Sequence, residues 1–277
     1  MESFGSIPFA TANMMLALSH VRSGLFLPAS NPRAIAKART LPCDMVILDL
    51  EDAVPDDAKD EARAAATEAA GTSWEGRLLA IRINAPDTDM GKADLAALAD
   101  VAGVDALILP KVETPPPDLG LPLLAMIETP SGLYAAREIA ARPNVAGLIV
   151  GPNDFAAALC LPAGSTRAEL ALPLQMILLA ARAAGIVALD GVYNRLDDSE
   201  GFAADARAAR RAGFDGKTLI HPSQVEPCNR IFAPLDEELA EARALIAAAT
   251  GGAERFRGRM IEAMHVATAR RVLERSR

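Results

Sequence analysis

The feature that most constrains the fold is a regular alternation of short apolar runs with alanine-rich segments of helical composition. Most of the runs are nearly continuous in hydrophobic residues, which is typical of strands covered on both faces. The eight runs lie at residues 23–29, 45–51, 78–84, 106–111, 121–128, 145–151, 187–192 and 217–221. Eight strands alternating with helices predict a (β/α)₈ TIM barrel, with a doubly wound open sheet as the alternative.

Two further patterns refine this prediction. Neither a GxGxxG nor a GxxxxGK[ST] motif occurs, which disfavours the nucleotide-binding forms of the open sheet. The fourth connection, "VETPPPDLG", is short and rich in proline, so we expect it to be irregular rather than helical.

The chain is longer at both ends than the predicted barrel. We expect an N-terminal extension at 1–21, the barrel at 22–225 and a C-terminal helical segment at 226–277. This last segment exceeds what barrel closure needs, and it therefore predicts a lid or an arm that reaches a neighbouring subunit.

Composition limits the classes of function. A formal net charge of −8 argues against nucleic acid and anionic membrane surfaces as partners. No apolar run reaches the roughly 18 residues of a membrane span, and the N-terminus lacks the pattern of a secretory signal. Three scattered cysteines, Cys43, Cys160 and Cys228, form neither a disulfide framework nor a zinc motif. We expect a cytoplasmic protein with unreactive thiols.

Polar residues gather where the predicted strands end. In a barrel of this type, the carboxyl ends of the strands carry the active site. The residues at these ends are Glu51, Asp52, Arg82, Asn84, Lys111, Glu128, Asp154, Asp190 and His221. Such a coincidence at nearly every one of the eight strands predicts a catalytic rim.

Glu128 and Asp154 follow the fifth and sixth predicted strands, which are neighbours in a barrel. Each also has an ordinary interpretation: Glu128 precedes a helix whose N-terminus favours a carboxylate, and Asp154 fits a helix N-cap. Two carboxylates that face one cavity repel each other, and a cation relieves that repulsion. Because Mg²⁺ commonly uses one or two carboxylates, the pair predicts a divalent metal site.

Arg82 alternates with Ile81 and Ile83, so it faces the opposite side of its strand. A buried arginine needs an anionic partner, either an internal one such as Asp49 or Glu51, or a substrate carboxylate. The residues alone leave both open.

The remaining candidates also have more than one interpretation. Lys111 is better explained as a positive charge that neutralises neighbouring carboxylates than as a lysine that forms a Schiff base. His221 suits a strap for its loop as well as a proton carrier, and Asp190 has a similar standing. Pleat alternation puts Glu51 on one face with Asp49 and turns Asp52 to the other.

Several blocks in order resemble one known family. They are "RSGLFLPASNP", "VILDLEDAV", "IRINAPDT", "LILPKVE", "MIETPSG", "GLIVGPNDF", "ALDGVY", "FDGKTLIHPSQV" and "RGRMIEAM". Together they resemble the HpcH/HpaI aldolase and citrate lyase β-subunit family over nearly the whole chain from Arg22 on. The resemblance implies a (β/α)₈ barrel that assembles as a homo-oligomer, a trimer or hexamer.

The resemblance also implies roles for individual residues. It makes Glu128 and Asp154 the ligands of Mg²⁺, with Mn²⁺ as a substitute, and Arg82 the contact of the oxo-acid carboxylate. Next to the metal and its waters it puts the pair Glu51 and Asp52. The resemblance also makes Gly151 and Pro152 of the "GPNDF" block substrate-binding residues.

Two blocks depart from the family pattern. Glu262 stands where relatives usually have an aspartate that reaches the neighbouring subunit's site, and one extra methylene shifts its carboxylate. In "FLPASNPRA" the loop after the first strand is altered, which bears on the CoA end of a substrate. Asn31 and Pro32 in this loop still suit an N-cap and first helical residue.

The resemblance implies a Mg²⁺-dependent carbon–carbon lyase that splits a citryl-, malyl- or citramalyl-CoA thioester into an acyl-CoA and a 2-oxo acid, with Glu262 as candidate acid or base. CoA would then be part of the substrate rather than a bound cofactor. The alternative is a class II pyruvate aldolase acting on 4-hydroxy-2-oxo acids, and a non-catalytic subunit is a third reading. Expected partners are small molecules of the oxaloacetate, glyoxylate, pyruvate or acyl-CoA class.

Overall fold

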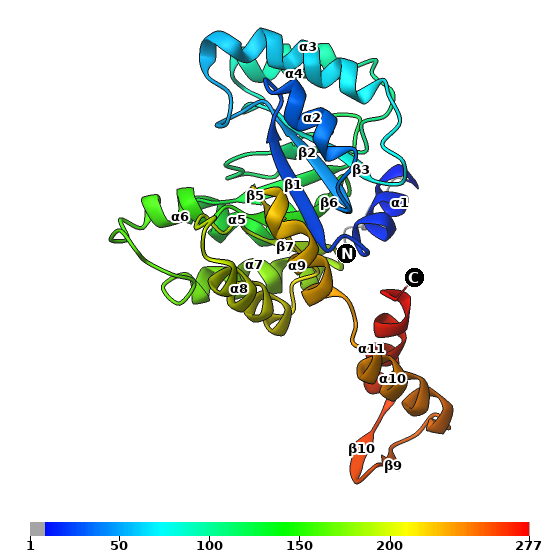
Figure 1. Cartoon of the computed structure of the whole chain (residues 1–277). Coiled ribbons are helices and arrows are strands. Elements are labelled where there is room, and N and C mark those ends of the chain that lie inside the picture. Colours follow the sequence, from blue (N-terminus) through cyan, green and yellow to red (C-terminus); the bar gives the residue numbers. More distant parts are fainter. Residues whose placement is uncertain (1–8, 277) are drawn as a thin grey trace, which may run out of the picture. The chain divides into compact units, whose positions relative to one another are not determined.

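The computed structural model of the chain describes residues 9–276, which divide along the sequence into two compact units, with the boundary between Ile231 and Phe232. In the first unit eight parallel strands close into a barrel in chain order, which confirms the predicted fold (Figure 1). The strands are β1 (Ser23–Pro28), β2 (Met45–Asp49), β3 (Leu78–Arg82), β4 (Ala106–Leu109), β5 (Leu123–Ile127), β6 (Val145–Val150), β7 (Val187–Asp190) and β8 (Gly216–Leu219).

All eight predicted runs end later than the observed strands. β2 stops at Asp49 and β3 at Arg82, so Glu51, Asp52 and Asn84 stand in the loops that follow. These polar residues therefore lie outside the strands, in the loops that form the rim of the barrel. The register of the barrel pairs Asp49 with Arg82 across β2 and β3.

Helices cover the outside of the barrel (Figure 1). They are α2 (Pro32–Ala38), α3 (Lys59–Ala70), α4 (Asp89–Leu98), α5 (Pro130–Ala140), α6 (Pro152–Ala158), α7 (Ala171–Ala184), α8 (Ser199–Ala212) and α9 (Val225–Phe232), with short 3₁₀ turns at Asp56–Ala58 and Pro222–Gln224. Asn31 caps α2 by accepting from the Ala34 backbone N–H at 3.1 Å, and Pro32 is its first residue, as predicted. The connection between β4 and β5 contains no helix, which confirms the prediction for this proline-rich segment.

The N-terminal segment contributes to the barrel core. Helix α1 (Phe9–Leu18) packs against β6, and Met14, Leu18 and Val21 join the apolar cluster of the barrel. That cluster is otherwise made of residues at alternate positions of most strands, as expected for side chains that fill a barrel. The described part of the predicted extension, residues 9–21, is therefore an integral part of the core, while residues 1–8 lie outside the described residues.

Strand alternation decides which polar residues face the barrel axis. Met45 and Ile47 of β2, Ala80 of β3, and Leu124 and Met126 of β5 belong to the interior cluster. The polar residues Asp49, Arg82 and Glu128 each come two positions after one of these interior residues. Because side chains alternate along a strand, these three also point inward. In β7 the interior residues are Val187 and Leu189, so Asp190 points outward.

The second unit is a small helical pair with a hairpin. Helices α10 (Asp236–Ala248) and α11 (Ala263–Glu274) pack together, and β9 (Glu254–Phe256) pairs antiparallel with β10 (Arg259–Ile261) (Figure 1). Its apolar centre contains Ala242, Leu245, Ile261 and Ala269. Among the helices of residues 9–276, none has the length and apolar character needed to cross a bilayer.

Candidate active site

Arg82 forms the buried centre of the barrel rim. Its Nε and Nη2 donate to the two carboxylate oxygens of Asp49 at 2.7 and 2.6 Å, and Nη1 lies 3.1 Å from Glu51 Oε2. The side chain is 11% exposed and that of Asp49 is 1% exposed. Both internal partners that the sequence suggested are therefore present, while contact with a substrate carboxylate stays a prediction.

The charges around Arg82 outweigh its burial. Burial alone would lower the pKa of Arg82, but the hydrogen bonds and charge of Asp49, with the further charges of Glu51 and Glu128, raise it. The guanidinium therefore stays a fixed positive charge in a nearly dry site, where its interaction with an anion is strongest.

Lys111 joins the two acidic residues that follow β2. Its Nζ lies 2.5 Å from Glu51 Oε1 and 3.2 Å from Asp52 Oδ2, so it balances carboxylates, as the sequence favoured. Burial raises the pKa of Glu51, against the lowering effect of Arg82 and Lys111. Glu51 lies with Asp49 at Arg82, as the sequence predicted, while Asp52 is more exposed and Lys111 joins its carboxylate to that of Glu51 beyond the end of β2.

Glu128 is buried beside Asp154. One carboxylate oxygen of Glu128 accepts the Lys111 backbone N–H at 2.7 Å, and the residue is 1% exposed. Lys111 adopts a left-handed backbone conformation, with φ +48°, to present this N–H. Burial raises the pKa of Glu128 to about 7, and the nearby charge of Asp154 adds to the increase.

Asp154 lies in the first turn of α6 rather than at its cap. The helix begins at Pro152, and Gly151 is the N-cap residue, so the N-cap interpretation of Asp154 is wrong. Pro152 at the first helical position suits its fixed φ. The Asp154 side chain is 39% exposed, and its Oδ1 lies 4.0 Å from Lys111 Nζ.

Gly151 makes room for the Glu128 carboxylate. A Cβ atom at this position would lie 2.1 Å from Glu128 Oε2 and 2.5 Å from Glu128 Cβ. No side chain fits that space without moving the carboxylate. Gly151 therefore shapes the site through its missing side chain, whereas its predicted substrate contact, and that of Pro152, stay predictions.

The change Gly151→Ala tests this close approach. We expect it to displace the Glu128 carboxylate, to lower the free energy of unfolding by about 1–3 kcal/mol through overpacking, and to weaken divalent-metal binding. Urea unfolding and calorimetric titration with Mg²⁺ measure the two effects. Gly252→Ala is the matched control, because a Cβ there meets nothing within 4 Å. Equal metal affinity in wild type and Gly151→Ala would refute this role.

The raised pKa of Glu128 predicts a pH-dependent stability for the metal-free protein. The folded state holds its proton up to about pH 7, whereas the unfolded state releases it near 4.5. The folded state thus binds more protons between these values, and its stability falls as pH rises through this window. Glu128→Gln lacks this loss, so in EDTA the variant should exceed wild type by on the order of 3 kcal/mol at pH 8 and by nothing at pH 4. A difference in the free energy of unfolding between the two proteins that stays the same at all pH values would contradict the prediction.

The donor set at this rim fits a hard divalent cation. Carboxylates outnumber cationic side chains here: Asp49, Glu51, Asp52, Glu128 and Asp154 surround Arg82 and Lys111. Within residues 9–276, no three acidic, histidine or cysteine side chains gather into a complete metal site. Two carboxylates with remaining positions left to water and substrate oxygens is the arrangement that Mg²⁺ favours.

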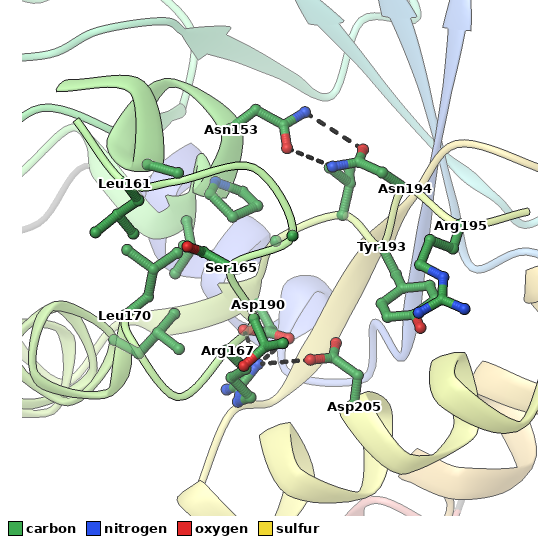
Figure 2. Close-up of a pocket in the computed structure, with 18 of the residues that line it drawn as sticks. Asn153, Leu161, Ser165, Arg167, Leu170, Asp190, Tyr193, Asn194, Arg195 and Asp205 are labelled. Carbon is green, nitrogen blue, oxygen red and sulfur yellow. Dashed lines mark hydrogen bonds and ion pairs between the residues drawn. The ribbon is translucent and has the colours of Figure 1, made fainter. Parts of the chain in front are cut away.

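Asp190 does not belong to this rim. Its carboxylate accepts from Arg167 Nη1 at 2.9 and 2.8 Å and from Lys217 Nζ at 2.7 Å, and Lys217 also pairs with Asp205 on α8. Figure 2 shows Asp190, Arg167 and Asp205 of this ionic cluster on the wall of an outer cavity of about 750 Å³, where Asn153 and Asn194 also bond to each other. The sequence could not separate Asp190 from the rim residues, because its strand-end position is the same.

The other candidates have structural partners. His221 Nδ1 lies 2.7 Å from Ser223 Oγ and accepts from the Ser223 backbone N–H, which suits a strap of its loop. Burial raises the pKa of Cys43 to about 11 and that of Cys228 to about 12, in agreement with unreactive thiols at these two positions, whereas Cys160 is exposed and its predicted inertness stays a prediction.

Glu262 lies in the second unit as the N-cap residue of α11. Its backbone N–H donates to His265 Nδ1 at 3.0 Å, and its backbone carbonyl accepts from the His265 N–H at 2.9 Å. Its approach to a neighbouring subunit's site stays a prediction.

A (β/α)₈ barrel whose rim joins paired carboxylates to a buried arginine is typical of enzymes that bind small anionic substrates. Residues 22–117 and 118–222 match the family model described as HpcH/HpaI aldolase/citrate lyase. The chain therefore belongs to this family, and it is an enzyme of the lyase type, as the sequence motifs implied.

Individual relatives agree with this membership. The chain is 41% identical to a (3S)-malyl-CoA thioesterase of Cereibacter sphaeroides, over 92% of this chain and 94% of the relative. It is 34% identical to the citrate lyase subunit beta of Leuconostoc mesenteroides subsp. cremoris, over 91% and 92%. Among solved structures, CitE of Mycobacterium tuberculosis in complex with magnesium, acetoacetate and coenzyme A superposes with a TM-score of 0.81 at 36% identity, covering 94% of this chain and 99% of that one.

Proposed function

We propose that the protein is a Mg²⁺-dependent lyase that cleaves the carbon–carbon bond of a 3-hydroxyacyl-CoA of the malyl, citramalyl or citryl type, or forms it in reverse. The observation that carries the proposal is that Glu128 and Asp154 both lie against Lys111: the buried Glu128 carboxylate accepts its backbone N–H at 2.7 Å, and Asp154 Oδ1 lies 4.0 Å from its Nζ. The complex of the M. tuberculosis relative with magnesium and coenzyme A supports both the metal and the thioester.

The chain's own residues account for the charges of such a reaction. Glu128 and Asp154 would hold Mg²⁺, which supplies a Lewis acid that makes the substrate hydroxyl easier to deprotonate. Arg82, held rigidly by Asp49, faces the carboxylate and the oxygen of the 2-oxo acid that forms, and it stabilises the charge there. Glu51 keeps its carboxylate between Arg82 and Lys111, where waters around the metal site can bond to it.

Glu262 is our candidate for the proton carrier. Bond cleavage takes a proton from the substrate hydroxyl and returns one to the enolate carbon of the departing acyl-CoA, so one carboxylate can serve both steps. We propose that Glu262 performs them from a neighbouring copy in a homo-oligomer. The capping geometry at the start of α11 gives its backbone a defined orientation for this role.

Thioester hydrolysis is the second candidate, favoured by one observation. The relatives at 41% identity bear the name (3S)-malyl-CoA thioesterase. In that reaction water attacks the thioester carbonyl and releases free CoA thiol, whereas the lyase leaves the thioester intact. The pyruvate aldolase that the sequence kept as an alternative differs from both, because it needs no CoA.

A substrate panel separates the lyase from the aldolase. Purified protein with Mg²⁺ is given malyl-, citramalyl- and citryl-CoA, and separately a 4-hydroxy-2-oxo acid, while coupled dehydrogenase assays follow glyoxylate, pyruvate and oxaloacetate. We expect an oxo acid to form from one of the thioesters and this activity to stop in EDTA. Formation of an oxo acid only from the CoA-free substrate would favour the aldolase, and no oxo acid from any compound would refute both.

A further inference from the structure

The loop that carries Glu51 is held from behind by a buried ammonium group. Lys59, the first residue of α3, is 7% exposed, and its Nζ donates to the backbone carbonyls of Leu50 and Glu51 at 2.7 Å each and to Asn84 Oδ1 at 3.0 Å. An ammonium group has three donors, so these three acceptors satisfy it completely. Most buried lysines pair with a carboxylate, whereas Lys59 donates mainly to two consecutive backbone carbonyls.

Further residues of the network fix Asn84 in turn. Asn84 Nδ2 donates to the Leu50 carbonyl at 3.0 Å and to Asp94 Oδ2 at 2.7 Å, and its backbone N–H donates to the same Asp94 oxygen at 2.8 Å. Arg63 Nε lies 2.8 Å from the other Asp94 oxygen. The loop after β2 is thus tied to α3, to the end of β3 and to α4.

This network acts on the side of the loop opposite the rim. The carbonyls of Leu50 and Glu51 turn toward Lys59, while the Glu51 side chain reaches Arg82 and Lys111. The Glu51 backbone N–H donates to Asp49 Oδ1 at 2.9 Å, so the peptide is held from both ends. The Leu50 N–H donates to the Arg82 carbonyl at 2.9 Å and the Val54 N–H donates to the Glu51 carbonyl at 3.1 Å, so Lys59 adds its two bonds to these backbone contacts beyond the end of β2.

We propose that Lys59 is a positioning residue, which orients the backbone of Leu50 and Glu51 so that the Glu51 carboxylate stays between Arg82 and Lys111. This role rests on the proposed function in that Glu51 must serve the reaction at the rim. Lys59 itself does not touch the substrate. Catalytic groups tolerate displacements of only about 0.5 Å, so a loosened Glu51 peptide has a direct effect on turnover.

Lys59→Met tests the proposal against a matched control. Arg22→Met breaks the Arg22–Asp44 pair, whose hydrogen bonds measure 2.8 and 2.9 Å. Both residues directly precede their strands, β1 and β2, so the pair lies at the amino ends of the strands, away from the rim. Both variants should lose stability in urea. We expect Lys59→Met to lower kcat at least about tenfold with KM within about threefold, and Arg22→Met to leave both constants near wild type. Lys59→Arg, which keeps the cation, should recover part of kcat and covers the case in which Lys59→Met does not fold.

A double-mutant cycle shows whether the effect passes through Glu51. In a Glu51→Gln background, Lys59→Met should lower kcat by less than about twofold, because the group it positions is already changed. An undiminished tenfold loss in that background, or an equal loss in Arg22→Met, would overturn the proposal.

A measurement without substrate keeps this test separate from the proposed function. In protein labelled with ¹³C at glutamate carboxyl groups, the Glu51 signal, assigned with Glu51→Gln, should shift in Lys59→Met and Lys59→Arg but not in Arg22→Met. If wild type cleaves no thioester, the proposed function fails while this shift still reports the positioning. An unmoved Glu51 signal in Lys59→Met overturns the inference even in an active enzyme.

Discussion

Glu128→Gln is expected to lower kcat about 10²- to 10³-fold and to remove most of the stabilisation that Mg²⁺ gives to the folded protein. The substitution keeps the shape of the side chain but removes the negative charge that would hold the cation. Glu128 is buried against Gly151 and the Lys111 N–H, so no exposed carboxylate can move into its place. Thermal unfolding with and without Mg²⁺, together with the oxo-acid assay, measures both effects.

The control for this experiment is an exposed carboxylate on the same protein. Asp57→Asn removes one negative charge from the turn before α3, where the side chain faces solvent. It should leave kcat and the Mg²⁺-dependent rise in Tm unchanged. Asp154→Asn should behave like Glu128→Gln. Full activity of either rim variant in saturating Mg²⁺ would show that the pair is not the metal site.

Arg82→Met should cost about 3–5 kcal/mol of the free energy of unfolding and abolish measurable turnover. Asp49 is 1% exposed and accepts both of its hydrogen bonds to Arg82 on its two oxygens. Removing the guanidinium leaves that carboxylate buried and without its countercharge, which is more costly than the loss of the pair itself. Urea unfolding at pH 8 gives the stability difference.

The double variant Asp49→Asn/Arg82→Met separates stability from catalysis. With both charges removed, most of the lost stability should return, because no buried ion remains unpaired. Activity should stay absent, since the positive charge that faces the substrate oxygens is still missing. A double variant that regains turnover would mean that Arg82 serves only to balance Asp49.

The barrel could be predicted from the sequence because its strands are buried on both faces. The run at 145–151 is apolar throughout and the run at 45–51 is apolar up to Leu48, and the helices between the strands have clear caps such as Asn31 and Gly185. The second unit was harder to predict: its hairpin is made of two three-residue strands that leave little trace in hydrophobic pattern.

Strand ends also indicated the rim, but they could not tell which side of the barrel wall a side chain takes. Glu128 and Asp190 both stand at a strand's carboxyl end, yet alternation sends the first inward and the second to the outer cavity. The role of Lys59 was equally hidden. A lysine at the start of a helix is ordinarily solvated, and only the fold brings the Leu50 and Glu51 carbonyls over its ammonium group.

The product balance of a single thioester turnover tests the central claim most directly. With the best substrate of the panel and Mg²⁺, the substrate lost, the 2-oxo acid formed, the acyl-CoA formed and the free thiol released are measured together over time. Cleavage of the carbon–carbon bond predicts one oxo acid and one acyl-CoA for each substrate consumed, no free thiol, no reaction in EDTA, and a reaction about 10²- to 10³-fold slower with Glu128→Gln. Free thiol in step with substrate loss, and no oxo acid, would contradict the account and make the protein a thioesterase.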